Sequence, residues 1–296
     1  ELLVFFLLEQ NIFPFLVNET EAVTYEAYKA AVAENNKVSI QGMMQGDGKD
    51  LEGRLYKPEG EGPFPALIAL HGAGGIFPYQ IWWAKEISKK GFVVLFLDSY
   101  CTRGYLCAHD TDDNDPRRKK IMQSWQKVSP RQRVMDAVAG YKYLSNQTNV
   151  KVDSIGLIGW SWGGSSALFA LKVAQRLNLP NGGFKGTIAF YPNLKHLKNS
   201  PQWGRTGPIG QPTLILYGKD DALESVKSYK ELMAEENESL IRVVDYPGAT
   251  RKFDELGKLR TKSHPQAGEF TKAFHRSSFE DAVKRVDEFL AEHFLK

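Results

Sequence analysis

Runs of apolar residues recur along the chain at strand length, most of them without alternation between apolar and polar positions. A continuous apolar run predicts a strand that is covered on both faces, as in a parallel sheet. An earlier segment, 36–58, shows two β-rich runs around a Gly/Asp turn, which predicts an antiparallel hairpin. The predicted parallel strands are 65–72, 92–98, 154–160, 186–192, 212–218 and 241–247.

Helical periodicity fills the stretches between these runs. One predicted helix begins near Tyr79 and ends at Gly91, a typical C-terminal residue, and a second opens at Ser129-Pro130. A third covers 277–295, with a Ser-x-x-Asp capping box predicted at its start. A hairpin followed by alternating strands and helices predicts an α/β domain with a doubly wound, mostly parallel sheet and helices on both faces.

The predicted domain organisation is a single α/β domain over 36–296, preceded by an N-terminal extension over 1–35. The extension opens with the apolar run Leu2–Leu8, which is too short to span a bilayer. That run fits either the remnant of a signal peptide, which implies export, or a segment that packs on the domain. Localisation therefore stays open between the cytoplasm and export. The long irregular segments 99–129 and 248–276 predict functional loops or additional helix.

The composition excludes several classes of function. A formal net charge of +3, from 38 basic and 35 acidic residues, is too balanced to predict a nucleic-acid partner. The acidic run 110–115 lacks the glycine and glutamate of a calcium-binding loop, and it lies beside the basic run 117–120. Cys101 and Cys107 form neither a disulfide framework nor a metal signature, although they leave a single pairing open. No cofactor and no metal are predicted.

The stretch Gly159-Trp160-Ser161-Trp162-Gly163 matches the G-x-S-x-G pattern of a nucleophile elbow. It connects a predicted buried strand to a predicted helix of small residues. A sharp turn there lifts the serine hydroxyl above the sheet, and glycines two positions before and after relieve the crowding of the backbone. This context predicts that Ser161 is a nucleophile.

Two segments are candidates for stabilising an oxyanion at Ser161. The backbone N–H of Trp162 opens the helix after the serine, and the loop His71-Gly72-Ala73-Gly74-Gly75 supplies a second donor through Ala73 or Gly74. His71 precedes the serine, whereas this fold places the catalytic histidine last in the chain. We therefore interpret His71 as bracing the loop.

A catalytic carboxylate is expected after a later strand. Asp220 and Asp221 follow the strand that ends at Gly218, and either one can also cap the helix predicted after them. The Gly-x-x-Asp spacing favours Asp221 as the carboxylate of a triad, with Asp220 as a cap or neighbour.

These segments together resemble the dienelactone hydrolase family of α/β-hydrolases. The resemblance covers roughly residues 38 to 294 and rests on six ordered blocks, which include "PALIALHGAGG", "IGLIGWSWGG", "PTLILYGKDD" and "YPGA…FD". It implies the α/β-hydrolase fold and hydrolysis of esters or lactones. The family's namesake enzymes have a cysteine in the elbow, where this chain has Ser161. Relatives carry the catalytic histidine two residues after "PGA", where this chain has Arg251.

The replacement of the histidine by Arg251 raises the question of which group accepts the proton of Ser161, because a guanidinium stays protonated at any working pH. Of the six histidines, His264 and His275 lie between the last predicted strand and the last helix. We take His264 as the candidate base, with a solvated loop histidine as the alternative, and His275 as a weaker candidate. His109, His196 and His293 are interpreted as surface or ordinary helix residues.

Two functions follow from these residues. The first is a serine hydrolase of small carboxylic esters or lactones, in which Ser161 attacks, Asp221 orients a base and an acyl-enzyme forms. The second is a hydrolase fold with impaired catalysis that binds a small anionic ligand through Arg251. The partner is a small molecule in both cases, and the oligomeric state is left open. The aromatic residues near the elbow fit either a substrate pocket or core packing: Trp160, Trp162, Tyr100 and Tyr105.

Overall fold

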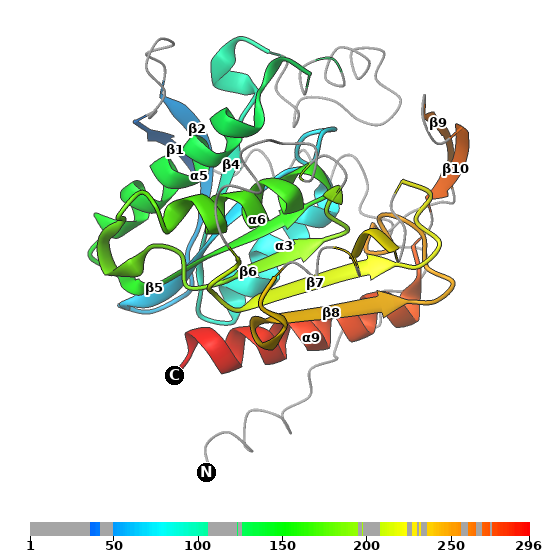
Figure 1. Ribbon diagram of the computed structural model, residues 1–296. Coiled ribbons are helices and arrows are strands. Elements are labelled where there is room, and N and C mark those ends of the chain that lie inside the picture. Colours follow the sequence, from blue (N-terminus) through cyan, green and yellow to red (C-terminus); the bar gives the residue numbers. More distant parts are fainter. Residues whose placement is uncertain are drawn as a thin grey trace.

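The computed structural model describes residues 36–41, 50–105, 126–194, 208–223, 236–255, 260–264, 268–272 and 274–296, with a few isolated positions between them. Its main feature is an eight-stranded sheet in the order β1-β2-β4-β3-β5-β6-β7-β8 (Figure 1). The first two strands and the β2–β4 pair are antiparallel, and all pairs from β4 to β8 are parallel. The predicted doubly wound, mostly parallel sheet with an N-terminal hairpin is confirmed.

The strands lie close to the predicted runs because each run supplies the side chains that the two faces of the sheet bury. Their bounds are β1 Lys37–Ile40, β2 Leu51–Tyr56, β3 Phe64–Leu70, β4 Val93–Asp98, β5 Val150–Trp160, β6 Thr187–Phe190, β7 Thr213–Gly218 and β8 Ile241–Tyr246. Every residue of β4, β6 and β7 is buried, as expected for parallel strands covered on both faces.

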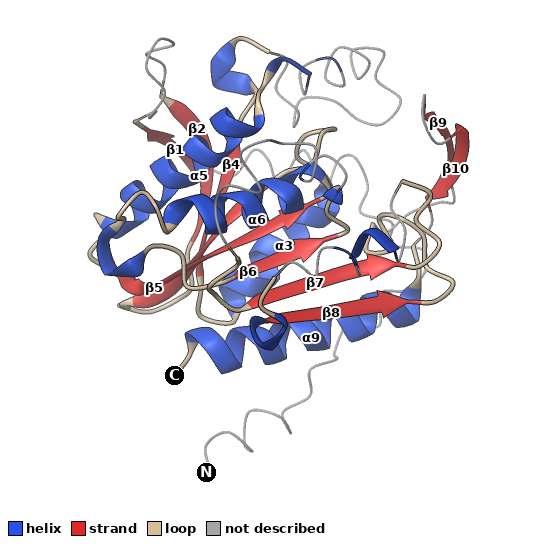
Figure 2. Cartoon of the chain, viewed as in Figure 1, coloured by secondary structure: helices blue, strands red, loops and turns tan. Residues whose placement is uncertain are grey.

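Helices cover both faces of this sheet (Figure 2). Helices α5 (Pro130–Ser145) and α6 (Trp162–Ala174) pack against each other on one face. Helices α3 (Pro78–Lys89) and α9 (Arg276–Phe294) lie together on the other, where Phe279 of α9 contacts the rings of Trp82 and Trp83. Short 3₁₀ segments cover Cys101–Arg103, Pro180–Gly182 and Glu238–Leu240.

Two of the predicted helix signals are present in the structure. Ser129 caps α5, because its Oγ accepts the N–H of Gln132 at 3.2 Å. Gly91 follows α3 with φ +90°, a conformation that suits glycine. Both ends therefore lie where the residue types predict.

The predicted capping box of the last helix is wrong. Helix α9 begins at Arg276, with His275 as its N-cap residue, so Ser278 and Asp281 already lie inside the helix. Ser278 Oγ instead lies 2.6 Å from His275 Nδ1, and Asp281 accepts a hydrogen bond from the Tyr246 hydroxyl at 3.1 Å. Ser278 and Asp281 therefore do not form a capping box with each other, and α9 begins at Arg276, earlier than the sequence pattern predicts.

Within the segment 248–276, the structure shows a hairpin that the sequence pattern did not predict. Strands β9 (Arg260–His264) and β10 (Gly268–Lys272) pair with each other and form a separate two-stranded sheet.

No helix in the described part of the chain is long and apolar enough to cross a membrane. The predicted extension 1–35, the acidic run 110–115 and Cys107 lie outside the described residues. Cys101 is disulfide-bonded.

Candidate active site

Ser161 occupies a sharp turn between β5 and α6. Its backbone angles are φ 56° and ψ −118°, which a non-glycine residue adopts only under strain. A Cβ on Gly163 would lie 1.9 Å from the carbonyl oxygen of Leu70, and a Cβ on Gly159 would lie 2.3 Å from the carbonyl oxygen of Gly163. The two glycines of the G-x-S-x-G pattern are therefore required by contacts between backbone atoms.

The loop after β3 lies against this turn. A Cβ on Gly72 would lie 3.1 Å from the carbonyl oxygen of Trp160 and 3.9 Å from Ser161 Oγ. The N–H of Gly75 donates to the carbonyl of Gly72 at 3.0 Å, which closes a tight turn around Ala73. Trp162 is the first residue of α6, where backbone N–H groups point out of the helix toward an anion. The two predicted donor segments thus flank Ser161, while the roles of Trp162 and Ala73 remain predictions.

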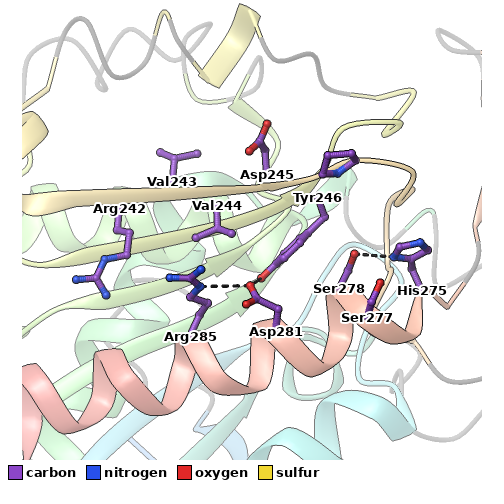
Figure 3. A pocket seen from close by; sticks show the side chains of 11 residues that line it. Arg242, Val243, Val244, Asp245, Tyr246, His275, Ser277, Ser278, Asp281 and Arg285 are labelled. Carbon is purple, nitrogen blue, oxygen red and sulfur yellow. Dashed lines mark hydrogen bonds and ion pairs between the residues drawn. The ribbon is translucent and has the colours of Figure 1, made fainter.

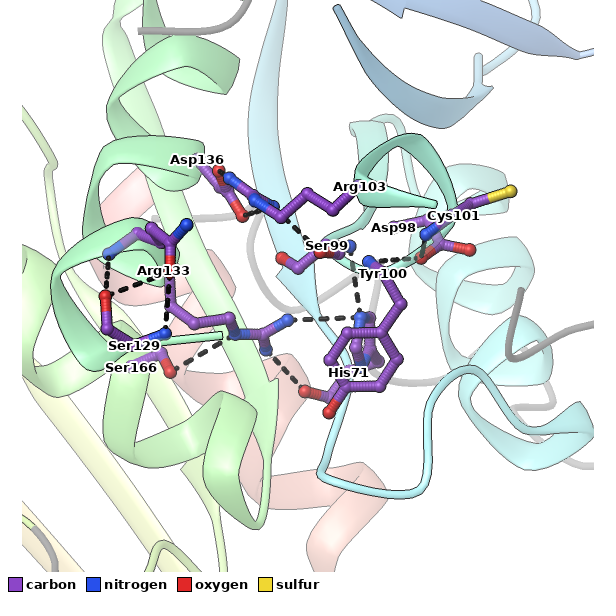
Figure 4. A network of polar contacts seen from close by, with 11 residues as sticks. His71, Asp98, Ser99, Tyr100, Cys101, Arg103, Ser129, Arg133, Asp136 and Ser166 are labelled. Atoms are coloured by element: carbon purple, nitrogen blue, oxygen red, sulfur yellow. Dashed lines mark hydrogen bonds and ion pairs between the residues drawn. The ribbon is translucent and has the colours of Figure 1, made fainter. Parts of the chain in front are cut away.

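His71 is buried in a polar network that holds this loop (Figure 4). Its Nε2 accepts the N–H of Ser99 at 3.2 Å and lies 3.1 Å from a guanidinium nitrogen of Arg133. Both neighbours are donors, so Nε2 carries no proton and Nδ1–H donates to the carbonyl of Gly72 at 2.7 Å. These contacts hold His71 as a neutral side chain that braces the loop, as interpreted from the sequence.

Arg133 joins the loop to helix α6. Its guanidinium donates to the carbonyl of His71 and lies 4.9 Å from the centre of the Trp162 ring. Burial lowers the pKa of Arg133, and the nearby Tyr100 and Asp136 oppose that shift. Asp136 itself forms two hydrogen bonds with Arg103, at 3.0 and 2.7 Å. Arg133 therefore contacts both segments that carry the candidate oxyanion donors.

Asp221 is buried, whereas Asp220 is exposed. Asp221 Oδ1 accepts the N–H of Leu223 at 3.0 Å, which fixes the carboxylate at the end of β7. Its Oδ2 accepts a hydrogen bond from Arg251 Nη1 at 2.6 Å. Asp221, and not Asp220, is thus the carboxylate directed at residue 251, where the sequence resemblance implies a histidine.

Arg251 bridges Asp221 and Ser161. While Nη1 binds the carboxylate, Nη2 donates to Ser161 Oγ at 2.8 Å. Burial lowers the pKa of Arg251, but the charge and hydrogen bond of Asp221, together with the nearby Tyr229 and Tyr191, outweigh burial and leave this pKa above its ordinary value. The guanidinium is therefore permanently charged, and it stands between serine and carboxylate in the place of a triad's imidazole.

The turn after β8 brings Arg251 to this position. A Cβ on Gly218 would lie 2.2 Å from the carbonyl oxygen of Ala249, so the end of β7 and the Pro247-Gly248-Ala249 segment are in backbone contact. The N–H of Asp220 donates to the carbonyl of Ala249 at 3.0 Å. These backbone contacts bring residue 251, where the sequence resemblance implies a histidine, to the end of β7.

Asp254 is a buried carboxyl below the site that sequence reasoning did not single out. It accepts hydrogen bonds from Trp83 Nε1 at 3.2 Å, Trp160 Nε1 at 3.0 Å and the Tyr191 hydroxyl at 2.8 Å. Burial raises the pKa of Asp254 to about 7, although the hydrogen bond from Tyr191 opposes this shift. The aspartate of "PGA…FD" was visible in the sequence, but its three partners come from distant segments. It ties the turn that carries Arg251 to the residue before Ser161.

The histidines considered as bases or surface residues lie in different parts of the chain. His264 ends β9 and pairs with Gly268, and its side chain lies outside the described residues, so its role as the base stays a prediction. His275 caps α9 and contacts Ser278. His293 lies in the last turn of α9, as interpreted, and burial lowers its pKa. His109 and His196 lie outside the described residues.

The aromatic residues near the elbow divide between two clusters. Trp160 belongs to the main hydrophobic core, while Tyr100 and Trp162 form a smaller buried cluster with Val128, against which Tyr105 packs. For Trp160, the open choice between pocket and core is therefore settled as core packing.

No group of histidine, cysteine or acidic side chains in the described part of the chain is arranged to hold a metal ion. A hollow of about 550 Å³ lies between β8 and α9 and is lined by Arg242, His275, Ser278, Asp281, Arg285 and their neighbours (Figure 3). Ser161, Asp221 and Arg251 do not line this hollow. The candidate chemistry therefore rests on the serine–arginine–aspartate arrangement.

The sequence matches the Dienelactone hydrolase family over residues 51–294, which is most of the chain. The chain belongs to the dienelactone hydrolase family. Members of this family are α/β-hydrolases. The family resemblance read from the motifs is thus confirmed.

Two curated proteins are similar in sequence. "Thiohydrolase aneE" of Aspergillus aculeatus is 32% identical over 134 residues, which are 45% of this chain and 37% of the fungal protein. The "Probable 2-oxo-3-(5-oxofuran-2-ylidene)propanoate lactonase" of a Bradyrhizobium species is 24% identical over 204 residues, which are 68% of this chain and 78% of that protein. The chain thus spans well under half of the fungal relative's length.

Solved structures share the fold. A dienelactone hydrolase-like promiscuous phosphotriesterase from metagenomic libraries superimposes with a TM-score of 0.64 at 18% identity, covering 87% of this chain and 98% of that one. Est1E from Butyrivibrio proteoclasticus superimposes with a TM-score of 0.59 at 16% identity, covering 88% of this chain and all of that one. At these identities the likeness concerns the arrangement of the elements.

Proposed function

We propose that the protein hydrolyses small carboxylic esters or lactones through an acyl-enzyme formed on Ser161. The observation that carries this proposal is the strained backbone of Ser161 at the strand-to-helix turn. A strained conformation persists when the surrounding structure imposes it, and here it presents a hydroxyl beside two candidate oxyanion donors. The names of the two curated relatives, a thiohydrolase and a lactonase, support acyl transfer as the reaction class.

In this proposal Ser161 attacks the carbonyl carbon of the substrate. The N–H groups of Trp162 and Ala73 stabilise the resulting oxyanion, and water then releases the acid. Asp221 fixes the guanidinium of Arg251 against the serine, as the ion pair of 2.6 Å indicates. His264 remains the sequence-based candidate for the group that accepts the serine proton.

The second candidate function is binding of a small anion by a hydrolase fold with impaired catalysis. The observation that favours it is the contact of the Arg251 guanidinium with Ser161 Oγ, because this contact sets a permanent positive charge where a base is needed. A carboxylate ligand would then pair with Arg251 and form no covalent bond with Ser161.

Turnover of p-nitrophenyl butyrate by the purified protein separates the two candidates. We expect Ser161→Ala to abolish turnover and to abolish labelling by a fluorophosphonate probe. Ser165→Ala is the matched control, because Ser165 lies one helical turn along α6 and its hydroxyl contacts backbone groups, those of Ser161 and Asn193. Equal labelling of wild type and Ser161→Ala would refute the assigned nucleophile.

The role of His264 has its own test. If His264 is the general base, His264→Ala should lower kcat/KM by at least about 100-fold, the low end for a positioned base. Full activity of this variant would remove His264 from the mechanism. An inert wild-type protein that binds carboxylates in calorimetry would establish the second candidate function.

A further inference from the structure

Arg251 contacts the reacting atom of the nucleophile and cannot take its proton. Its Nη2 donates to Ser161 Oγ at 2.8 Å, so the serine oxygen is the acceptor in this contact. In a triad, the serine hydroxyl is the donor and an imidazole is the acceptor. The polarity of the contact is thus reversed, and a reversed contact stabilises an oxygen that carries negative charge.

Two further features favour negative charge on Ser161 Oγ, and a third positions the guanidinium that faces it. Ser161 immediately precedes the first residue of α6, so the positive end of the helix dipole faces it. The carboxylate of Asp221 binds the other guanidinium nitrogen and holds the positive charge in place. Ser161 itself is only half-buried, which gives solvent access to its hydroxyl.

We infer that Arg251 stabilises Ser161 as an alkoxide, and that the substrates are acyl compounds whose leaving group departs unaided as an anion: thioesters, aryl or enol esters, and enol lactones. This inference rests on the proposed function, since it requires Ser161 to be the nucleophile, and it replaces His264 with hydroxide as the base.

The reaction balances with hydroxide from solvent as the base. Hydroxide removes the proton of Ser161 Oγ and becomes water, and the alkoxide forms an ion pair with Arg251. The alkoxide adds to the carbonyl carbon, and the tetrahedral intermediate expels the leaving group as a thiolate, phenolate or enolate. A second hydroxide then adds to the acyl-enzyme, and collapse of that intermediate returns the carboxylic acid and the alkoxide.

The leaving-group restriction follows from the same side chain. An imidazolium that has taken the serine proton returns it to the leaving group as a general acid. A guanidinium stays protonated at any working pH and does not carry out this proton transfer. An alkoxide or amide anion without a cationic partner is too basic to leave without a proton, and only the Ser161 oxygen has the guanidinium of Arg251 beside it. A thiolate or phenolate is stable near neutral pH, since free thiols and phenols have pKa values of about 8.5 and 10.

The first test is a leaving-group series with a constant butyryl group. We expect wild-type protein to hydrolyse S-phenyl thiobutyrate and p-nitrophenyl butyrate, and to hydrolyse ethyl butyrate at least about 100-fold more slowly than an Arg251→His variant does, because that variant regains a general acid. The preference for p-nitrophenyl over ethyl ester should therefore be steeper in wild type than in Arg251→His. Equal preferences in the two proteins would overturn the inference.

The second test is the pH dependence of kcat/KM for the thioester. Hydroxide as the base predicts a rate that rises about tenfold per pH unit through pH 9, whereas a histidine base predicts a plateau above about pH 7. Arg251→Lys keeps the positive charge but loses the planar guanidinium, whose two nitrogens bind Ser161 and Asp221 at the same time. We expect this variant to retain the slope and to lose at least about tenfold in rate.

The outcomes separate the two proposals. Turnover that depends on Ser161 but reaches a plateau near pH 7 overturns the inference and leaves the proposed function standing. Absence of any turnover that depends on Ser161, with every substrate of the series, removes both.

Discussion

The elbow at 159–163 and the turn at 247–254 sit side by side, yet they are held in different ways. Gly159 and Gly163 lie so close to other backbone atoms that no Cβ fits. The turn meets the end of β7 through its backbone at Ala249, but its positions 251 and 254 are held by their side chains: Arg251 binds Asp221 and Ser161, and Asp254 binds Trp83, Trp160 and Tyr191. Where a Cβ would overlap backbone atoms, only glycine fits. A position whose side chain faces polar groups accepts any residue that can form hydrogen bonds with them. This difference explains how the elbow keeps its pattern while arginine occupies the position of the base.

The largest expected effect lies in the elbow. Gly163→Ala would place a Cβ 1.9 Å from the carbonyl oxygen of Leu70, so β3 and α6 would have to separate. We expect a loss of more than about 4 kcal/mol in the free energy of unfolding, or no folded protein, as urea denaturation would show. Gly182→Ala is the control, because a Cβ on Gly182 meets no atom within 4 Å and only the strain of its φ of +79° is expected, about 1–2 kcal/mol. A similar loss in both variants would contradict the steric explanation.

The next effect concerns the ion pair of Asp221 and Arg251, which are both almost completely buried. Arg251→Met leaves the Asp221 carboxylate without its charge partner, and we expect it to cost about 3–5 kcal/mol in the free energy of unfolding. Adding Asp221→Asn to that variant should recover most of the loss, since no buried charge then remains. A double-mutant cycle by urea denaturation measures this coupling. Additive losses would show that the two residues act independently.

The third effect is a dependence of stability on pH from Asp254. Burial raises its pKa to about 7, from an ordinary value of 3.8. The folded chain therefore keeps the proton up to about pH 7, while the unfolded chain releases it near pH 4. Stability should fall as pH rises through this window, by up to about 4 kcal/mol, and level off above it.

Thermal denaturation between pH 4 and pH 8 checks this dependence. Asp254→Asn keeps an acceptor for the indole N–H groups and removes the titration, so we expect a flatter profile. Asp220→Asn changes an exposed carboxyl nearby and serves as the control. An unchanged slope in Asp254→Asn would assign the dependence to other groups.

The smallest effect should come from a glycine in the turn. Gly248 has φ +78°, but a Cβ there would meet only His275 Nε2, at 3.8 Å. Gly248→Ala therefore costs only the conformational strain, about 1–2 kcal/mol in the free energy of unfolding. Urea denaturation beside Gly163→Ala tests the contrast between the two regions directly. A loss as large as that of Gly163→Ala would show that the turn is also fixed by its backbone.

Much of the fold could be predicted from the sequence because its strands are apolar along their whole length. The apolar runs 92–98 and 212–218 predict buried strands. Their alternation with helices predicts that they pair in parallel with the other strands of one sheet. The hairpin of β9 and β10 was missed, since "RTKSH" and "GEFTK" carry mostly polar residues and no apolar period. The start of α9 was misplaced because Ser278 and Asp281 bind His275 and Tyr246.

The candidate site was predictable where a motif carries its own geometry. The G-x-S-x-G pattern located Ser161, and the spacing after β7 favoured Asp221 over Asp220. The contact of Arg251 with both residues depends on how the end of β7 meets the turn after β8, which no local pattern encodes. Asp254 was overlooked for the same reason, since Trp83, Trp160 and Tyr191 reach it from three separate segments.

The hydrogen bonds of Asp254 give the protein a built-in optical reporter. Two of its six tryptophans, Trp83 and Trp160, donate their indole N–H groups to this one carboxyl. Indole emission responds to charge at the ring nitrogen, so protonation of Asp254 should change the intrinsic fluorescence. The proton on a carboxyl buried beneath the elbow can therefore be followed in the native protein without a dye.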